Sequence, residues 1–291
     1  VLVKLVLEHD YLRQSPALAQ PFEPGGATEE NRRLHAAILR ANIDVKPDYN
    51  TSIFHQKFMV RDGESVLTGS TNFTDTGTSA NLNHIVVVHD PQVALIYSRE
   101  FREIQQGHFG ALNEGHGASP DELTVSGVPI KILFAPDHAP EMEMMKQMLK
   151  ARSRIDFAIF TFAQSSGIDD TMLAQAKQAL KIKGALDAQA ANQTWAATHQ
   201  LKGKANIKLW SVGKAAGINK LHHKLMVLDK RVVICGSFNY TGPANQLNDE
   251  NIMILGSFDE ASESSKAKQK KIGEYCVKEI ERIIDKFGKK I

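Results

Sequence analysis

Two segments of the chain share one arrangement of chemically active residue types. Residues 55–74 read HQKFMVRDGESVLTGSTNFT and residues 222–241 read HHKLMVLDKRVVICGSFNYT, with a constant offset of 167 residues. Each contains His-x-Lys, an Asp five residues after the lysine, and then Gly-Ser-x-Asn. Because six fixed positions occur twice, the pattern indicates a functional site rather than accidental strand histidines.

The first part of each motif suits a site that receives an anion. Residues two apart in a strand project to the same side, so His55 and Lys57 point together, as do His222 and Lys224. A lysine beside an imidazole is a poor choice for a core, because burial and like charge both disfavour the protonated forms. Two such pairs meeting at one point would hold a phosphate group.

The second part of each motif adds donors. The Gly-Ser-x-Asn turns can bring amide, hydroxyl and backbone N–H groups to the same point. We therefore predict a phosphate-binding set that consists of Lys57, Lys224, Ser70, Ser237, Asn72 and Asn239.

Two histidines at such a site can divide the cleavage of a phosphodiester. One imidazole attacks phosphorus and the other protonates the leaving oxygen, and a pKa near 6.5 permits either role. No metal ion or cofactor is needed, because the lysines supply the positive charge. We predict that His223, on the opposite side of its strand, is a packing or hydrogen-bonding residue, and that Asp62 and Asp229 are structural ion-pair or turn partners.

The flanks of the motifs repeat too, and they predict the fold. A strand, a helix and a strand precede the first motif at 1–8, 28–42 and 43–49, and the same order occurs at 180–187, 193–203 and 205–212. A strand and a helix follow each motif. Strands that alternate with helices predict an α/β fold with mixed sheets flanked by helices.

The repeats also predict the domain organisation. We expect a first unit at 1–107, a linker at 108–127 that is rich in Gly, His, Asn and Ser, and a second unit at 128–291. Residues 128–179 have no counterpart before Val1, so we expect the first unit to lack roughly 50 residues at its N-terminus. A signal peptide lost with them would make the protein secreted or periplasmic.

Composition narrows the functional classes. The net charge is only +2, so a polyanion must be held by local charge. The sequence contains no uninterrupted run of about 18 apolar residues, so it predicts no transmembrane helix. Cys235 and Cys276 are expected to be buried free thiols, and His108 and His116 in the linker are too isolated to predict a metal site.

The doubled motif resembles the motif that defines the phospholipase D superfamily. The resemblance to this superfamily covers nearly the whole chain. The resemblance implies a pseudo-twofold monomer, an internal pseudo-dimer, with one active site where the two repeats meet. It also implies a phosphohistidine intermediate and then hydrolysis by water or transfer to an alcohol. In two-motif members the first histidine is usually the nucleophile, which would make His55 the nucleophile and His222 the general acid.

Two further residues bear on this assignment. The family places a polar or acidic residue after each Gly-Ser-x-Asn to orient a catalytic histidine, and here Glu250 and Asn83 match it. A carboxylate raises the basicity of its imidazole, so the histidine beside Glu250 should be the nucleophile. If the pairing crosses between repeats, that residue is His55, and if it stays within a repeat, it is His222.

Substrate choice stays open between two classes. The compact units resemble the bacterial endonuclease-like branch, which favours a metal-independent endonuclease that cleaves DNA or RNA. The alternative is a phospholipase D that hydrolyses or transfers phospholipid head groups. A basic lip around the second motif would favour nucleic acid, and the candidates are Lys214, Lys220, Lys230 and Arg231.

Overall fold

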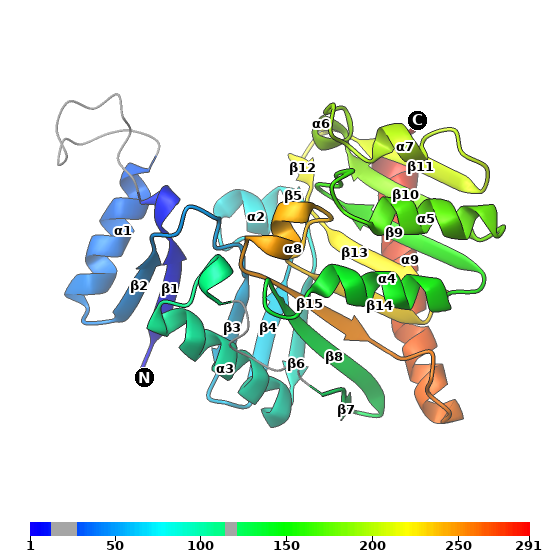
Figure 1. Cartoon of the computed structure of the whole chain (residues 1–291). Coiled ribbons are helices and arrows are strands. Elements are labelled where there is room, and N and C mark those ends of the chain that lie inside the picture. The colour runs from blue at the N-terminus through cyan, green and yellow to red at the C-terminus, as the bar shows by residue number, and fades with distance from the viewer. Residues whose placement is uncertain (13–27, 114–120) are drawn as a thin grey trace.

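The computed structural model describes residues 1–12, 28–113 and 121–291 and is dominated by one nine-stranded mixed sheet (Figure 1). The sheet has the strand order β16-β11-β10-β9-β13-β14-β15-β8-β7, and only its three neighbours β9, β10 and β11 run parallel. Its strands are β7 (Leu123–Val125), β8 (Val128–Ala135), β9 (Arg154–Ile159), β10 (Lys181–Asp187), β11 (Ile207–Val212), β13 (Lys224–Leu228), β14 (Val232–Gly236), β15 (Glu250–Leu255) and β16 (Gly288–Lys290).

The first repeat is built from smaller sheets. Parallel strands β1 (Lys4–Glu8) and β2 (Asp44–Asp48) form one sheet, and antiparallel strands β3 (Phe58–Arg61), β4 (Ser65–Gly69) and β6 (Ile85–His89) form another. In the second repeat β9 lies between β10 and β13 and joins the equivalent strands into one sheet. Within the described residues no strand does this between β1 and β3, the counterparts of β10 and β13, so the first repeat keeps two sheets.

A short strand pair links the repeats beside the motifs. β5 (Asn81–Leu82) of the first repeat pairs in parallel with β12 (Lys220–Leu221) of the second. The helices of the first repeat are α1 (Glu29–Arg40), α2 (Asp75–Ser79) and α3 (Pro91–Gln106), with short 3-10 turns η1 (His9–Tyr11) and η2 (Gly110–Leu112).

Two hydrophobic cores cover the faces of the large sheet. The helices of the second repeat are α4 (Pro140–Lys150), α5 (Ile168–Lys177), α6 (Ala188–Ala191), α7 (Thr198–Leu201), α8 (Gly242–Gln246) and α9 (Glu263–Phe287). Helices α4 and α5 pack on one face, while α9 packs on the other, where the core also includes side chains of α3, β4 and β6 (Figure 1). β13 and β14 are therefore buried along their whole length, which explains why they carry only apolar residues and glycine apart from Lys224.

Local sequence fixes the ends of these elements. Asp90 accepts hydrogen bonds from two backbone N–H groups at the start of α3, and Gly107 ends that helix with a φ of 101°. In the two motif hairpins, Asp62–Gly63 and Asp229–Lys230 have positive φ at both turn positions. Such turns match the twist of the paired strands, so the motif aspartates lie at the tips of tight hairpins.

The predicted fold class is confirmed: the chain forms mixed sheets flanked by helices in two related units. One predicted helix is wrong in extent, because 193–203 forms only the single turn of α7. The segment predicted as a linker contains η2 and β7, and β7 pairs with β8; its His116 lies outside the described residues. Both cysteines are free as expected, but Cys276 is only partly buried.

No helix in the described part of the chain has the length and apolar character needed to cross a membrane.

Candidate active site

The histidine of the first motif is held by the second repeat. The Nδ1 atom of His55 lies 2.7 Å from both carboxylate oxygens of Glu250, the first residue of β15. The backbone N–H of His55 donates to the carbonyl of Asp249 at 3.0 Å. Because Nδ1 is occupied by the carboxylate, Nε2 is the nitrogen left to meet a substrate.

The histidine of the second motif is held by the first repeat in the same way. His222 Nδ1 lies 2.9 Å from Asn83 Oδ1 and 3.0 Å from the carbonyl of Ser70, and its backbone N–H donates to Leu82. Asn83 is fixed in turn, since its amide donates to Gly77 and its oxygen accepts from the Ser70 hydroxyl. The pairing therefore crosses between repeats, and Glu250 serves His55.

The residue that follows each motif histidine also makes a contact with the other repeat. In the first repeat Gln56 accepts a hydrogen bond from the amide of Asn251 at 3.2 Å. At the equivalent place His223 and His84 stack with an interplanar angle of 11°, and their Nδ1 atoms are 3.1 Å apart. His223 thus makes the packing and hydrogen-bonding contacts expected of it. His84 was not predicted, although it lies 167 residues before Asn251.

The two motif lysines are buried beside the histidines. Lys57 and Lys224 are 7% and 2% exposed, and each ammonium donates to the carbonyl of its own motif histidine. Burial lowers the pKa of Lys57 to about 8 and, with the charge of Lys57, lowers the pKa of Lys224 well below its usual value. Two buried ammonium groups that repel each other favour a bound anion between them.

The lysines also affect both imidazoles. Burial and the charges of Lys57 and Lys224 lower the pKa values of His55 and His222, so both rings are neutral at neutral pH. Burial raises the pKa of Glu250 to about 8, against the pull of the same lysines. In the free site, Glu250 therefore stays protonated up to a mildly basic pH.

The motif serines connect each motif to the next strand. Ser70 and Ser237 are fully buried, and their hydroxyls accept from the backbone N–H groups of His84 and Asn251. These contacts position Asn83 and Glu250, and the predicted phosphate contacts of the serines stay a prediction. Asn72 and Asn239 follow in turns and are partly exposed.

The motif glycines allow this close approach. Gly69 and Gly236 have φ values of 145° and 154°. A Cβ atom on Gly69 would lie 2.3 Å from the carbonyl oxygen of His84, and one on Gly236 would lie 2.2 Å from that of Asn251. Only glycine fits at both places.

The motif aspartates lie away from the histidines. Asp229 accepts from the backbone N–H groups of residues 152–154 and from the hydroxyl of Ser153. Asp62 is exposed and lies 3.9 Å from Arg61. Both are turn residues in the structure.

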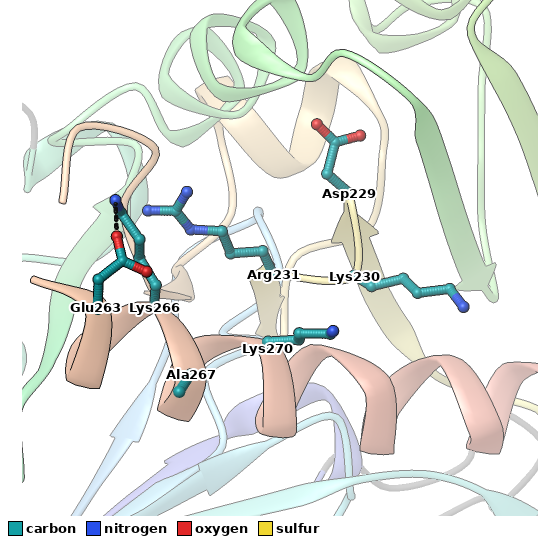
Figure 2. A pocket seen from close by; sticks show the side chains of 7 residues that line it. All are labelled: Asp229, Lys230, Arg231, Glu263, Lys266, Ala267 and Lys270. Carbon is teal, nitrogen blue, oxygen red and sulfur yellow. Dashed lines mark hydrogen bonds and ion pairs between the residues drawn. The ribbon is translucent and has the colours of Figure 1, made fainter. Parts of the chain in front are cut away.

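Two of the four residues predicted for the basic lip do not lie at the site. Lys230 and Arg231 follow β13 at the end opposite Lys224, where they line a surface hollow of about 410 Å³ with α9 (Figure 2). A strand advances about 3.3 Å per residue, so closeness in sequence does not bring them to the site. Lys220 does lie there, 4.8 Å from the ring centre of Phe160, and Lys214 is exposed in the same connection.

Within the described ranges, no three His, Cys, Asp or Glu side chains group in a way that could hold a metal ion.

Comparison with known proteins identifies the family of the chain. Residues 1–105 and 144–271 match the family model "Cardiolipin synthase, PLD-like domain". A mitochondrial cardiolipin hydrolase of Xenopus tropicalis is 28% identical over 36% of this chain and 43% of its own length. A phospholipase D of Rickettsia conorii is 31% identical over 32% of this chain and 48% of its own length, so the chain spans about half the length of these relatives.

One solved structure has the same fold over almost the whole chain. Phosphatidylserine synthase of Haemophilus influenzae superposes with a TM-score of 0.65 and 11% identity, over 99% of this chain and 74% of that one. The family match covers most of the chain and includes both motifs. The chain therefore belongs to the phospholipase D superfamily, whose members are phosphodiesterases.

Proposed function

We propose that the protein cleaves phosphodiesters through a covalent intermediate on His55, with His222 as general acid. The observation that carries this proposal is the unequal pairing of the two imidazoles. His55 Nδ1 meets the carboxylate of Glu250, whereas His222 Nδ1 meets an amide oxygen and a backbone carbonyl. In its ionised form, which is populated from about pH 8, Glu250 raises the basicity of His55 and stabilises the cationic phosphohistidine, so His55 is the nucleophile.

The reaction proceeds in two balanced steps. In the first, the lone pair of His55 Nε2 forms a bond to phosphorus while the bond to the leaving oxygen breaks, and that oxygen takes a proton from His222 Nε2. In the second, neutral His222 accepts a proton from water as the water oxygen attacks phosphorus. The bond between phosphorus and His55 then breaks, and both imidazoles return to their starting state.

The lysines make this sequence possible. Their charges stabilise the negative charge that develops on the phosphoryl oxygens. They also keep His222 neutral in the free protein. An anionic phosphate between them offsets their charges, which raises the pKa of His222 and lets the ring carry the proton that it donates.

The substrate that we propose is nucleic acid, cleaved without a metal ion. Support comes from the cationic side chains at the site, where Lys220 adds to the two motif lysines. No base-reading module is visible in the sequence, so little sequence preference is expected.

A second candidate is phospholipid. The relatives named above are a cardiolipin hydrolase and a phospholipase D. Exposed apolar side chains also occur on the segments that adjoin Asp249 and His55, which fits acyl chains: Ile53, Leu112 and Leu247.

One experiment separates the two candidates. The protein is incubated in excess EDTA with single- and double-stranded DNA, with RNA, and with vesicles of phosphatidylcholine or of cardiolipin. Cleavage of nucleic acid supports the first candidate, and release of head group without such cleavage supports the second. Activity that EDTA abolishes would contradict the metal-independent mechanism.

A further inference from the structure

An aromatic ring lies close to both His222 and a third lysine. Phe160 directly follows β9, and its backbone N–H donates to the carbonyl of His223 at 2.9 Å. Its ring is 4.9 Å from the ring of His222, and the ammonium groups of Lys220 and Lys224 lie 4.8 Å and 5.0 Å from its centre. The ring of Phe160 therefore neighbours both Lys220 and His222, the proposed general acid.

The ammonium of Lys220 is available to a ligand, unlike those of the motif lysines. Lys57 and Lys224 are buried and donate to carbonyls, whereas Lys220 is partly exposed and its ammonium forms no ion pair or hydrogen bond within the described part of the chain. Its backbone is fixed, because β12 pairs with β5 and the next N–H donates to Asp187. The fold thus holds the base of this side chain and leaves its charge free.

The two repeats differ at this position. The residue 167 places before Lys220 is Ile53, which is 37% exposed. The half of the site that carries His222 therefore has an additional cation, and the half that carries His55 has an aliphatic side chain. Since His222 protonates the leaving oxygen, Lys220 lies on the side where the leaving group departs.

We propose that Lys220 and Phe160 form a leaving-group subsite that binds the phosphate next to the scissile one in a nucleic acid strand. The inference rests on the proposed function above. A nucleic acid leaving group carries its own phosphate, which the free ammonium can pair with. It also carries a sugar and a base, for which the ring of Phe160 offers an apolar surface.

The test compares thymidine dinucleotides with one scissile phosphate and either no terminal phosphate or one at either end. The readout is the ratio of kcat/KM for the phosphorylated dinucleotide to that for the unphosphorylated one. Wild-type protein should prefer one phosphorylated form, and Lys220→Ala should lower that ratio about tenfold to hundredfold, the usual effect of losing a charged hydrogen bond. Lys220→Arg should largely preserve it.

Lys181→Ala is the matched control, because Lys181 is an exposed lysine at the opposite end of β10 from Asp187 and should leave the ratio unchanged. With a longer single strand, Lys220→Ala should also reduce the slope of log kcat/KM against log salt by about 0.7.

Two outcomes would overturn the inference. If Lys220→Ala lowers kcat/KM equally for the phosphorylated and the unphosphorylated dinucleotide, the lysine acts on the imidazoles and not on the leaving group. If the variant lowers kcat/KM for neither dinucleotide, Lys220 does not bind substrate. A wild-type protein that cleaves bis(p-nitrophenyl) phosphate but no nucleotide substrate would contradict the nuclease proposal itself, which is a distinct result.

Discussion

The two motif histidines have unequal partners, and the roles that we propose for them rest on this difference. Glu250 is fully buried against His55, while the corresponding residue beside His222 is the neutral Asn83. The offset of 167 residues identified both partners in the sequence. It could not decide which histidine each one meets, because a period in sequence carries no information on whether contacts cross between repeats.

The rate should therefore follow the charge states of Glu250 and Lys57. Burial raises the pKa of Glu250 and lowers that of Lys57, both to about 8. Below pH 8 the carboxyl is protonated and cannot hold the Nδ1 proton of His55, and above pH 8 Lys57 loses its charge. We predict a bell-shaped dependence of kcat/KM on pH, centred near 8, because this parameter reports the free protein.

Glu250→Gln should remove the acidic limb of that profile. Its amide oxygen can still accept from His55 Nδ1, but without the charge kcat/KM should fall roughly 10- to 100-fold. Measurement from pH 5 to 10 with bis(p-nitrophenyl) phosphate checks this. An acidic limb that persists near pH 8 in the variant would show that another group titrates.

At the scale of elements, the segment that begins β15 holds the first motif in place. Asp249 accepts from His55 through its carbonyl, Glu250 meets the imidazole, and Asn251 donates to Gln56. The sequence predicted the strand and Glu250. It did not predict Asp249 and Asn251 as contacts, because both make them across the repeat boundary.

Asp249 should make stability fall as the pH rises. Burial raises its pKa to about 8, and its side chain accepts from the Gly110 N–H. An unfolded Asp ionises near 4, so between about pH 4 and 8 the folded state binds the extra proton and loses stability with rising pH. Asp249→Asn removes this term and should raise the Tm relative to wild type at pH 9, with little difference at pH 4.

Thermal unfolding at several pH values measures this difference, and Asp62→Asn, at an exposed hairpin tip, is the control. A Tm difference that does not change with pH would exclude ionisation of Asp249 as its cause.

At the scale of the whole molecule, two repeats of one chain complete one site. The strand and helix patterns predicted the α/β layers, and the internal repeat identified both motifs. The positions of Lys230 and Arg231 were missed because β13 carries them to its far end, and Phe160 was missed because it lies outside the repeated motif. Both errors concern distances that sequence spacing does not report.

A site built within one chain predicts the outcome of a mixing experiment. If equal amounts of separately folded His55→Asn and His222→Asn proteins are combined, no activity should return, because neither chain holds both imidazoles. The folded state of each variant is checked by its Tm. Recovery of activity would mean that repeats from two copies assemble the site.

The central claim is that the crossed contact with Glu250 makes His55 the nucleophile. The most direct test is to quench the protein during turnover of bis(p-nitrophenyl) phosphate at pH 8 and to locate the bound phosphoryl group by mass spectrometry of its peptides. We predict the modification on His55 in the wild type and in His222→Asn, and none in His55→Asn. Modification of His222 instead, or in the His55→Asn variant, would contradict the account.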